Sequence, residues 1–174
     1  ADLVAISIVR ELGPIMTAIL VAGRSGSAFA AEIGTMQVNE EVDALVTMGF
    51  DPMTFLSVPK LLAMLAVTPI LTVFADLHGI LGGLVVGVTG LDLTARAYLA
   101  ETHAALTAPS ILASLVKSEV FAVLIATVGC QRGFRVRGGA DAVGAAATSA
   151  VVTSIFLIII ADSAFALVQQ YLGI

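Results

Sequence analysis

The run from Val151 to Val168 is the most apolar stretch of the chain, and Asp162 is the only charged residue among its eighteen positions. That length is close to the roughly 20 residues that a helix needs to cross the hydrocarbon core of a bilayer. Three other long apolar stretches precede this run. Because a lipid-exposed segment must satisfy its own backbone hydrogen bonds, the sequence predicts an all-α fold, a polytopic membrane helical bundle with four visible spans.

Composition agrees with a membrane protein. The chain is 59% hydrophobic and 12% charged, whereas soluble domains are about a quarter charged. The net charge of −5 argues against a nucleic-acid partner, because no basic face is present to neutralise phosphates. Cys130 is the only cysteine, which excludes an intrachain disulfide and a cysteine-based metal site.

We expect a single transmembrane domain over residues 1–174, with spans at about 3–34, 59–90, 110–130 and 143–172. The first residue is alanine rather than methionine, and it lies inside an apolar run. We therefore expect this domain to be incomplete at its N-terminus.

Small residues recur at every fourth position of the first span. This ladder is formed by Ala18, Ala22, Gly26, Ala30 and Gly34. Small side chains allow helix backbones to approach closely in lipid. The ladder therefore packs either against other helices of the same subunit or at a dimer or transport-path interface. Pro14, which precedes it, is expected to kink the helix or to mark a new start.

A short acidic helix is predicted between the first two spans, at about residues 38–48. Thr35 or Asn39 can cap it, and acidic residues fall in its first turn, where the helix dipole favours negative charge. Its apolar face is formed by Val42, Leu45 and Val46. Such a helix either docks in a groove of another protein or forms a solvated interfacial loop.

The basic residues indicate the orientation. The short acidic helix and the loop with Arg132, Arg135 and Arg137 are two spans apart, so they lie on the same face. With Arg24 and Lys60, that face holds five of the eight basic residues. The positive-inside rule then makes this face cytosolic.

Several charged residues fall within or near the ends of the spans. Arg24 and Glu32 are expected to reach the interface, to pair, or to face a wet cavity. Lys117 is expected to extend its ammonium group outward. An alternative function, an ion-coupled carrier or proton channel, would use Asp76, His78, Lys117, Glu119 and Asp162.

The sequence has no set of residues that supports catalysis. A phosphate-binding loop of the type G-x-x-x-x-G-K-S/T requires a Gly-Lys pair, and the chain has none. No zinc-protease motif of the type H-E-x-x-H occurs either. We therefore expect a protein without catalytic or metal-binding residues, whose energy source is another polypeptide or an ion gradient. A membrane scaffold that does not transport is a third possibility.

The stretch from Arg10 to Lys60 contains an ordered series of short motifs. They are Arg10-Glu11-Leu12-Gly13-Pro14, Val21-Ala22-Gly23-Arg24-Ser25-Gly26, Ala31-Glu32-Ile33-Gly34-Thr35-Met36, Glu40/Glu41-Val42-Asp43-Ala44-Leu45, Met48-Gly49 and Asp51-Pro52. This stretch resembles the MlaE (YrbE) permease family of lipid-transporting ABC systems. Lys60 stands where the family commonly has Arg, which keeps the charge and loses the bidentate fork.

The resemblance implies a permease subunit in the bacterial inner (cytoplasmic) membrane that moves phospholipid or a related lipid between this membrane and the outer envelope, as in the maintenance of outer-membrane asymmetry. It implies a homodimer that pairs with a cytosolic ABC ATPase and with an MCE-domain protein on the outer side. ATP and Mg would bind to the ATPase, and this chain would hold no cofactor.

The resemblance also implies roles for individual residues. Docking of the ATPase would involve the short acidic helix, as a coupling helix, through Glu40, Glu41, Val42, Asp43, Leu45, Val46 and Met48. The lipid cavity or dimer interface would involve Arg10, Glu11, Leu12, Ala18, Ala22 and Gly26.

Overall fold

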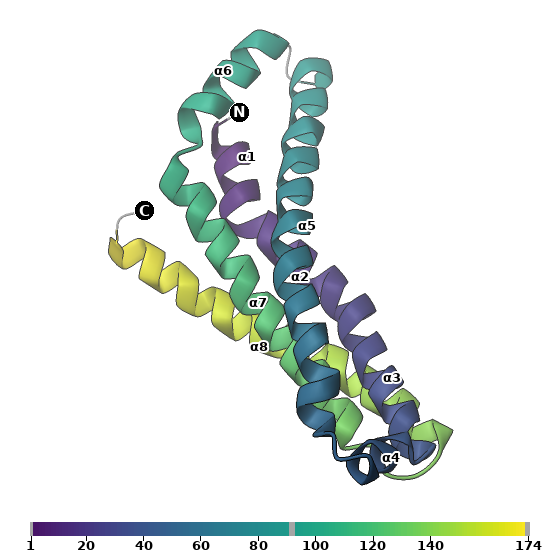
Figure 1. The fold of residues 1–174 in the computed structure, drawn as a ribbon. Coiled ribbons are helices and arrows are strands. Elements are labelled where there is room, and N and C mark those ends of the chain that lie inside the picture. The colour runs from purple at the N-terminus through teal and green to yellow at the C-terminus, as the bar shows by residue number, and fades with distance from the viewer. Residues whose placement is uncertain (1, 91–92, 173–174) are drawn as a thin grey trace.

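A computed structural model describes residues 2–90 and 93–172, and the regular elements within these ranges are all helices (Figure 1). The all-α prediction is confirmed. A single rod, broken only by two π-helical turns, is formed by α1 (Asp2–Ser7), η1 (Ile8–Leu12), α2 (Gly13–Val21), η2 (Ala22–Gly26) and α3 (Ser27–Val38). The helices after it are α4 (Glu41–Thr47), α5 (Pro52–Gly90), α6 (Ala95–Ala105), α7 (Ala108–Phe134) and α8 (Ala140–Leu172).

Four helical segments of the described chain are long and apolar enough to cross a membrane, as the sequence predicts. They are Leu3–Val38, Pro52–Gly90, Ala108–Phe134 and Ala140–Tyr171. The second segment begins at Pro52 rather than at about residue 59. The carboxylate of Asp51 caps α5, since it accepts hydrogen bonds from the backbone N–H groups of Met53 at 3.3 Å and Thr54 at 3.2 Å.

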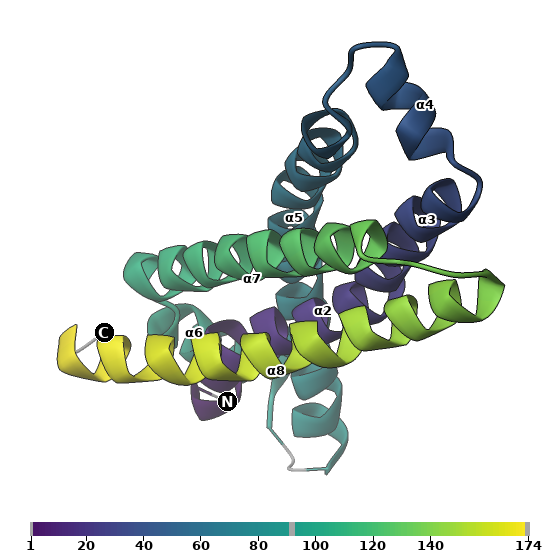
Figure 2. The same ribbon diagram turned by 90° about the horizontal axis from the view of Figure 1, so that it is seen from below.

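The spans form a bundle around α7, which packs against α3, α5 and α8. Figure 2 shows α7 and α8 side by side, crossing the rod of α1–α3. The short helices lie at opposite ends of the bundle, α4 beside the C-terminal end of α3 and α6 beside α1 (Figure 1). The bundle therefore has an α4 end and an α6 end.

The small-residue ladder packs against α7 within the subunit. Ala18 and Ala22 are fully buried, and a Cβ atom on Gly129 of α7 would lie 2.8 Å from the carbonyl oxygen of Gly26. The structure therefore shows the ladder in the first of its two predicted roles, close packing of helices inside one subunit. Ala18, Ala22 and Gly26 lie in this intrasubunit contact, and not on an outer surface of the described bundle.

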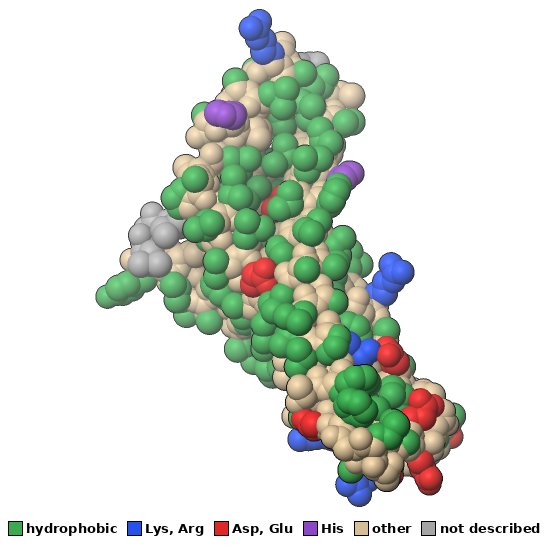
Figure 3. Space-filling view, in the orientation of Figure 1, with side chains coloured by type: hydrophobic (Ala, Val, Ile, Leu, Met, Phe, Trp, Pro, Cys, Tyr) green, Lys and Arg blue, Asp and Glu red, His purple; other side chains and the backbone are tan. Residues whose placement is uncertain are grey.

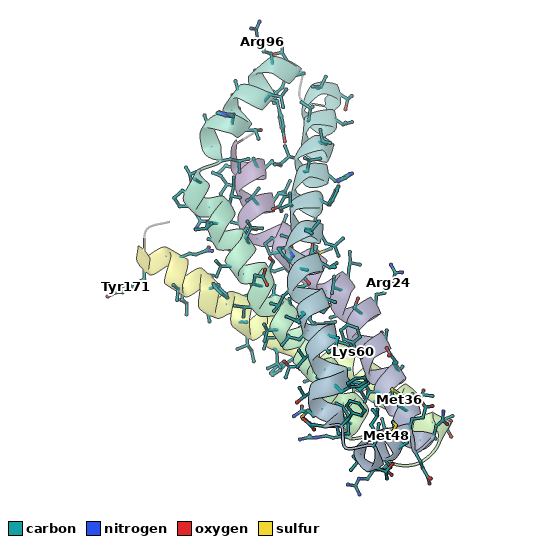
Figure 4. The ribbon with its side chains drawn as sticks, viewed as in Figure 1. Arg24, Met36, Met48, Lys60, Arg96 and Tyr171 are labelled. Carbon is teal, nitrogen blue, oxygen red and sulfur yellow. The ribbon has the colours of Figure 1, made fainter. Side chains whose placement is uncertain are left out.

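Large apolar side chains cover the outer faces of α5 and α8, and those of α5 are visible in Figure 3. Phe74 on α5 is 56% exposed, and Phe156 on α8 is 63% exposed. Charged side chains gather instead at the α4 end, and Arg96 lies at the opposite end (Figures 3 and 4). An apolar belt between charged ends suits a bundle surrounded by lipid.

Candidate functional site

The chain reverses direction between α3 and α4 at a single left-handed residue. Glu40 has a φ of 61° and a ψ of 16°, and it occupies the N-cap position of α4. The predicted caps Thr35 and Asn39 are wrong. Thr35 donates to the Ala31 carbonyl within α3, and Asn39 ends α3. The predicted helix exists, and a backbone reversal rather than a side-chain cap defines its start.

α4 turns most of its predicted coupling residues outward. Val42 is buried, with 6% of its surface exposed, and Leu45 is half-buried. Val46 and Met48 are 57% and 62% exposed. The remaining predicted coupling residues, Glu40, Glu41 and Asp43, are also exposed. Val42 and Leu45 of the predicted apolar face therefore anchor the helix, whereas Val46 does not. The outer surface of α4 combines acidic and apolar side chains.

The turn after α4 is also well defined. Gly49 has a φ of +84°, a value that glycine adopts without strain. The Phe50 N–H donates to the Leu45 carbonyl at 3.0 Å. The rings of Phe50 and Phe55 then pack with their centroids 5.3 Å apart. α4 is therefore held at both ends, by the reversal at Glu40 and by this aromatic pair at the start of α5.

An ion pair joins α3 to α5 near α4. Lys60 Nζ lies 2.7 Å from Glu32 Oε2 and 5.1 Å from the centroid of the Phe29 ring. Glu32 thus pairs, as one of its predicted possibilities, and Lys60 reaches a carboxylate although it lacks the fork of arginine. Arg24 points away from the bundle, whereas Lys60 lies against it (Figure 4).

A second polar site lies inside the bundle. Lys117 is fully buried on α7, and its Nζ is 2.8 Å from Glu11 Oε2 of η1 and 2.7 Å from Asp162 Oδ1 of α8. We refer to Glu11, Lys117 and Asp162 as the buried ion cluster. Burying charges is costly unless they are paired, and here one ammonium lies between two carboxylates. The cluster therefore ties three helices together.

The ammonium group of Lys117 has one further partner, the carbonyl oxygen of Arg10, and the Gly13-Pro14 step explains why this carbonyl is available. Pro14 has no N–H to donate to the Arg10 carbonyl four residues earlier. The Gly13 N–H donates to the carbonyl oxygen of Ile8, five residues earlier, and this hydrogen bond belongs to a π-helical turn. Lys117 Nζ donates to the Arg10 carbonyl oxygen at 3.1 Å. Pro14, which is predicted to kink the helix or to mark a new start, instead follows a π-helical turn within a continuous rod. The lysine uses the carbonyl that the proline cannot.

The structure brings together residues that the sequence left apart. Arg10 also contacts α8, through a 3.3 Å hydrogen bond from its Nη2 to Gln169 Oε1. The prediction that Lys117 extends outward is wrong, because opposite charges on two other spans hold it in the interior. The carboxylates in those spans could have indicated this arrangement, since a charge within a membrane span needs a partner.

The other predicted intramembrane residues lie outside the buried ion cluster. Asp76 on α5 packs its carboxylate against Gly13, while Glu119 is half-buried on α7. In the described ranges, neither of the two forms an ion pair. His78 bonds only within its own helix, to the Phe74 carbonyl. Among the described residues, no group of three or more His, Cys, Asp or Glu side chains is placed to hold a metal ion.

The family model described as Permease MlaE matches residues 1–168. The chain belongs to the MlaE permease family. This MlaE chain is 43% identical over 162 residues to a probable ABC transporter permease protein of Rickettsia felis, across 93% of this chain and 62% of the relative. It is also 43% identical over 157 residues to a probable ABC transporter permease protein of Synechocystis, across 90% of this chain and 60% of the relative.

A plant protein is also similar to this chain. The MlaE chain is 39% identical over 158 residues to the chloroplastic protein TRIGALACTOSYLDIACYLGLYCEROL 1 of Arabidopsis thaliana, across 91% of this chain and 45% of the relative. The chain therefore spans less than two thirds of the length of each of these three relatives. The matches place the chain among proteins named as probable ABC transporter permeases.

Proposed function

We propose that this chain is the permease subunit of an ATP-driven transporter that moves phospholipid or a related lipid between the bacterial inner membrane and the outer envelope. The observation that carries the proposal is α4, an exposed acidic and apolar helix set between two spans at the charged end of the bundle. The permease family supports ATP-driven transport. The name of the plant relative, which contains that of a galactolipid, supports a lipid as the cargo.

The partners follow from the same proposal. A cytosolic ABC ATPase, which holds ATP and Mg, seats on α4, so this end of the bundle faces the cytosol. A second copy of the chain completes the lipid path, beside Arg10, Glu11 and the exposed side chain of Leu12. An MCE-domain protein receives or delivers the lipid at the α6 end. The basic residues near α4 support this orientation through the positive-inside rule.

Movement of the ATPase would reach the spans through short, defined links. α4 continues into α3 at one end and into α5 at the other, and the Glu32–Lys60 pair connects these two helices. Displacement of α4 therefore acts on α5 and on α3, which is continuous with η1 in one rod. The buried ion cluster holds η1, α7 and α8 as a unit, against which α5 can move to change access to the lipid path.

The test is a charge placed on the outward face of α4 in the full-length protein, co-expressed with its ATPase. Val46→Asp leaves the folded bundle intact, because Val46 is 57% exposed, and we expect it to abolish co-purification of the ATPase. Leu99→Asp is the matched control, since Leu99 is 52% exposed on α6 at the opposite end. ATPase retained equally by both variants would contradict the coupling role of α4.

The cargo is tested in the same preparation by mass spectrometry of the bound lipid. Enriched phospholipid or a related lipid is the expected result. The ion-coupled alternative rests on the charged residues inside the spans. Lipid transport in proteoliposomes that continues without ATP and varies with pH would favour this alternative and reject the ATP-driven proposal.

A further inference from the structure

A polar groove of about 470 Å³ lies beside α4. Glu40 and Asp43 line one wall, Arg137 and Val136 of the α7–α8 loop line the other, and Gln37 and Phe134 also contribute to it. The groove therefore joins the proposed coupling helix to a second segment of the chain, nearly one hundred residues later in the sequence.

The loop is fixed rather than loosely placed. The Gln37 side chain donates from Nε2 to the Phe134 carbonyl at 3.4 Å. Val136 is 7% exposed, and it packs over Gly34, where an added Cβ would lie 2.8 Å from Val136 Cγ2. With Val136 turned inward, Arg135 and Arg137 are both exposed. Only Arg137 lines the groove.

Charges of opposite sign line the two walls without pairing. Glu40, Asp43 and Arg137 are all exposed. No ion pair joins them in the part of the chain that the structure describes. A segment that offers both a cation and an anion can pair with both walls, whereas an anionic lipid headgroup would meet two carboxylates. The charge pattern thus fits a protein segment of mixed charge.

We propose that this groove is a second part of the ATPase-docking surface and receives a partner segment with a basic residue against Glu40 and Asp43 and an acidic residue against Arg137. The inference rests on the proposed function, and it adds the α7–α8 loop to the interface. Charges at the edge of an interface act mainly on partner choice and on the rate of encounter. The loop therefore selects the correct ATPase, while α4 provides the main contact.

The experiment measures the affinity of the purified full-length permease for its ATPase in mild detergent at several salt concentrations. Arg137→Glu should weaken binding by about threefold to tenfold at low salt, because charge reversal at an interface is repulsive. The difference from the native chain should shrink as salt rises. Arg135→Glu is the matched control, since it makes the same charge change on the same loop outside the groove.

The opposite wall supplies an independent pair of variants. Asp43→Lys should weaken binding as Arg137→Glu does. Glu41→Lys should have less effect, because Glu41 does not line the groove and its carboxylate accepts a hydrogen bond from Asn39. Agreement between the two walls would support a segment of mixed charge, and an effect confined to one wall would overturn it.

The outcomes also separate this inference from the proposed function. If Arg137→Glu and Arg135→Glu weaken binding equally, general charge attraction explains the result and the groove is not a docking site. If neither has an effect while Val46→Asp abolishes binding, the groove inference fails and the coupling role of α4 stands. If all three variants bind normally, both fail. If Arg137→Glu changes only binding to anionic phospholipid vesicles, a membrane role replaces the docking role.

Discussion

α4 and the buried ion cluster are two polar regions of a largely apolar bundle, and they are built in opposite ways. On α4, acidic groups such as Asp43 lie in the open and form few contacts with the rest of the chain. In the cluster, Lys117 has no exposed surface, and its ammonium contacts two carboxylates and a carbonyl oxygen. The acidic groups of α4 thus stay available to contacts from outside the chain, whereas the ammonium of Lys117 is satisfied within it.

The sharpest test of this contrast is removal of the buried ammonium. We expect Lys117→Met to lower the free energy of unfolding by about 3 kcal/mol, because it leaves the largely buried carboxylate of Asp162 without its partner. Thermal unfolding of the detergent-solubilised protein measures this loss. Adding Glu11→Gln and Asp162→Asn to the same variant should recover part of the stability. Unchanged thermal stability in Lys117→Met would show that the cluster does not hold the bundle together.

Close packing beside the cluster provides a second test. In Gly13→Ala, the new methyl group would overlap the carboxylate of Asp76, so we expect destabilisation of about 1–3 kcal/mol. The double variant with Asp76→Ala should restore much of the loss, because it removes the group that clashes. Additive losses in the double variant would mean that the two residues do not share this contact.

The Glu32–Lys60 pair lies between the two extremes, and its effect on stability should be small. Glu32 is 57% exposed, and exposed ion pairs contribute about 0–1 kcal/mol. Lys60→Met should therefore fold and bind the ATPase, yet transport less lipid for each ATP hydrolysed. Lys60→Arg serves as the control that keeps the charge. If Lys60→Met transports lipid as efficiently as the native chain, α4 acts on the spans without this link.

The smallest expected effect is at the cap of α5. The Thr54 hydroxyl and then the Thr54 N–H hold the pKa of Asp51 below its ordinary value of 3.8. A lowered pKa in the folded state means that the cap stabilises α5 above the ordinary pKa and is lost as pH falls through the lowered value. The protection factor of the Thr54 amide against hydrogen exchange, which corrects for the intrinsic pH dependence of exchange, should therefore fall in acid. In Asp51→Asn this acid dependence should disappear, and its persistence would assign the effect to another group.

Sequence patterns were sufficient for features that depend on neighbouring residues. The four spans follow from long apolar runs, and α4 follows from acidic and apolar residues at helical spacing between turn residues. The start of α4 did not follow, because Glu40 adopts a left-handed backbone that no side-chain preference at Thr35 or Asn39 indicates.

The contacts between distant segments could not be read in this way. Glu11, Lys117 and Asp162 come from three helices, and no local pattern says which charged residues of a bundle face one another. The resemblance to the family supplied the roles of α4 and of the dimer, and these remain predictions. The Gly13-Pro14 step was visible as a break, but the partner of the carbonyl that it frees lies on another span.

The buried ion cluster also has a consequence for how the chain enters the membrane. During synthesis the N-terminal segments emerge first, so Glu11 is already in the bilayer when α7 brings in Lys117. An unpaired lysine at that depth is unfavourable, and pairing with Glu11 allows α7 to insert before α8 exists. Asp162 then arrives last and closes the assembly. The lysine, which is the fully buried member of the cluster, thus meets a carboxylate as soon as α7 enters.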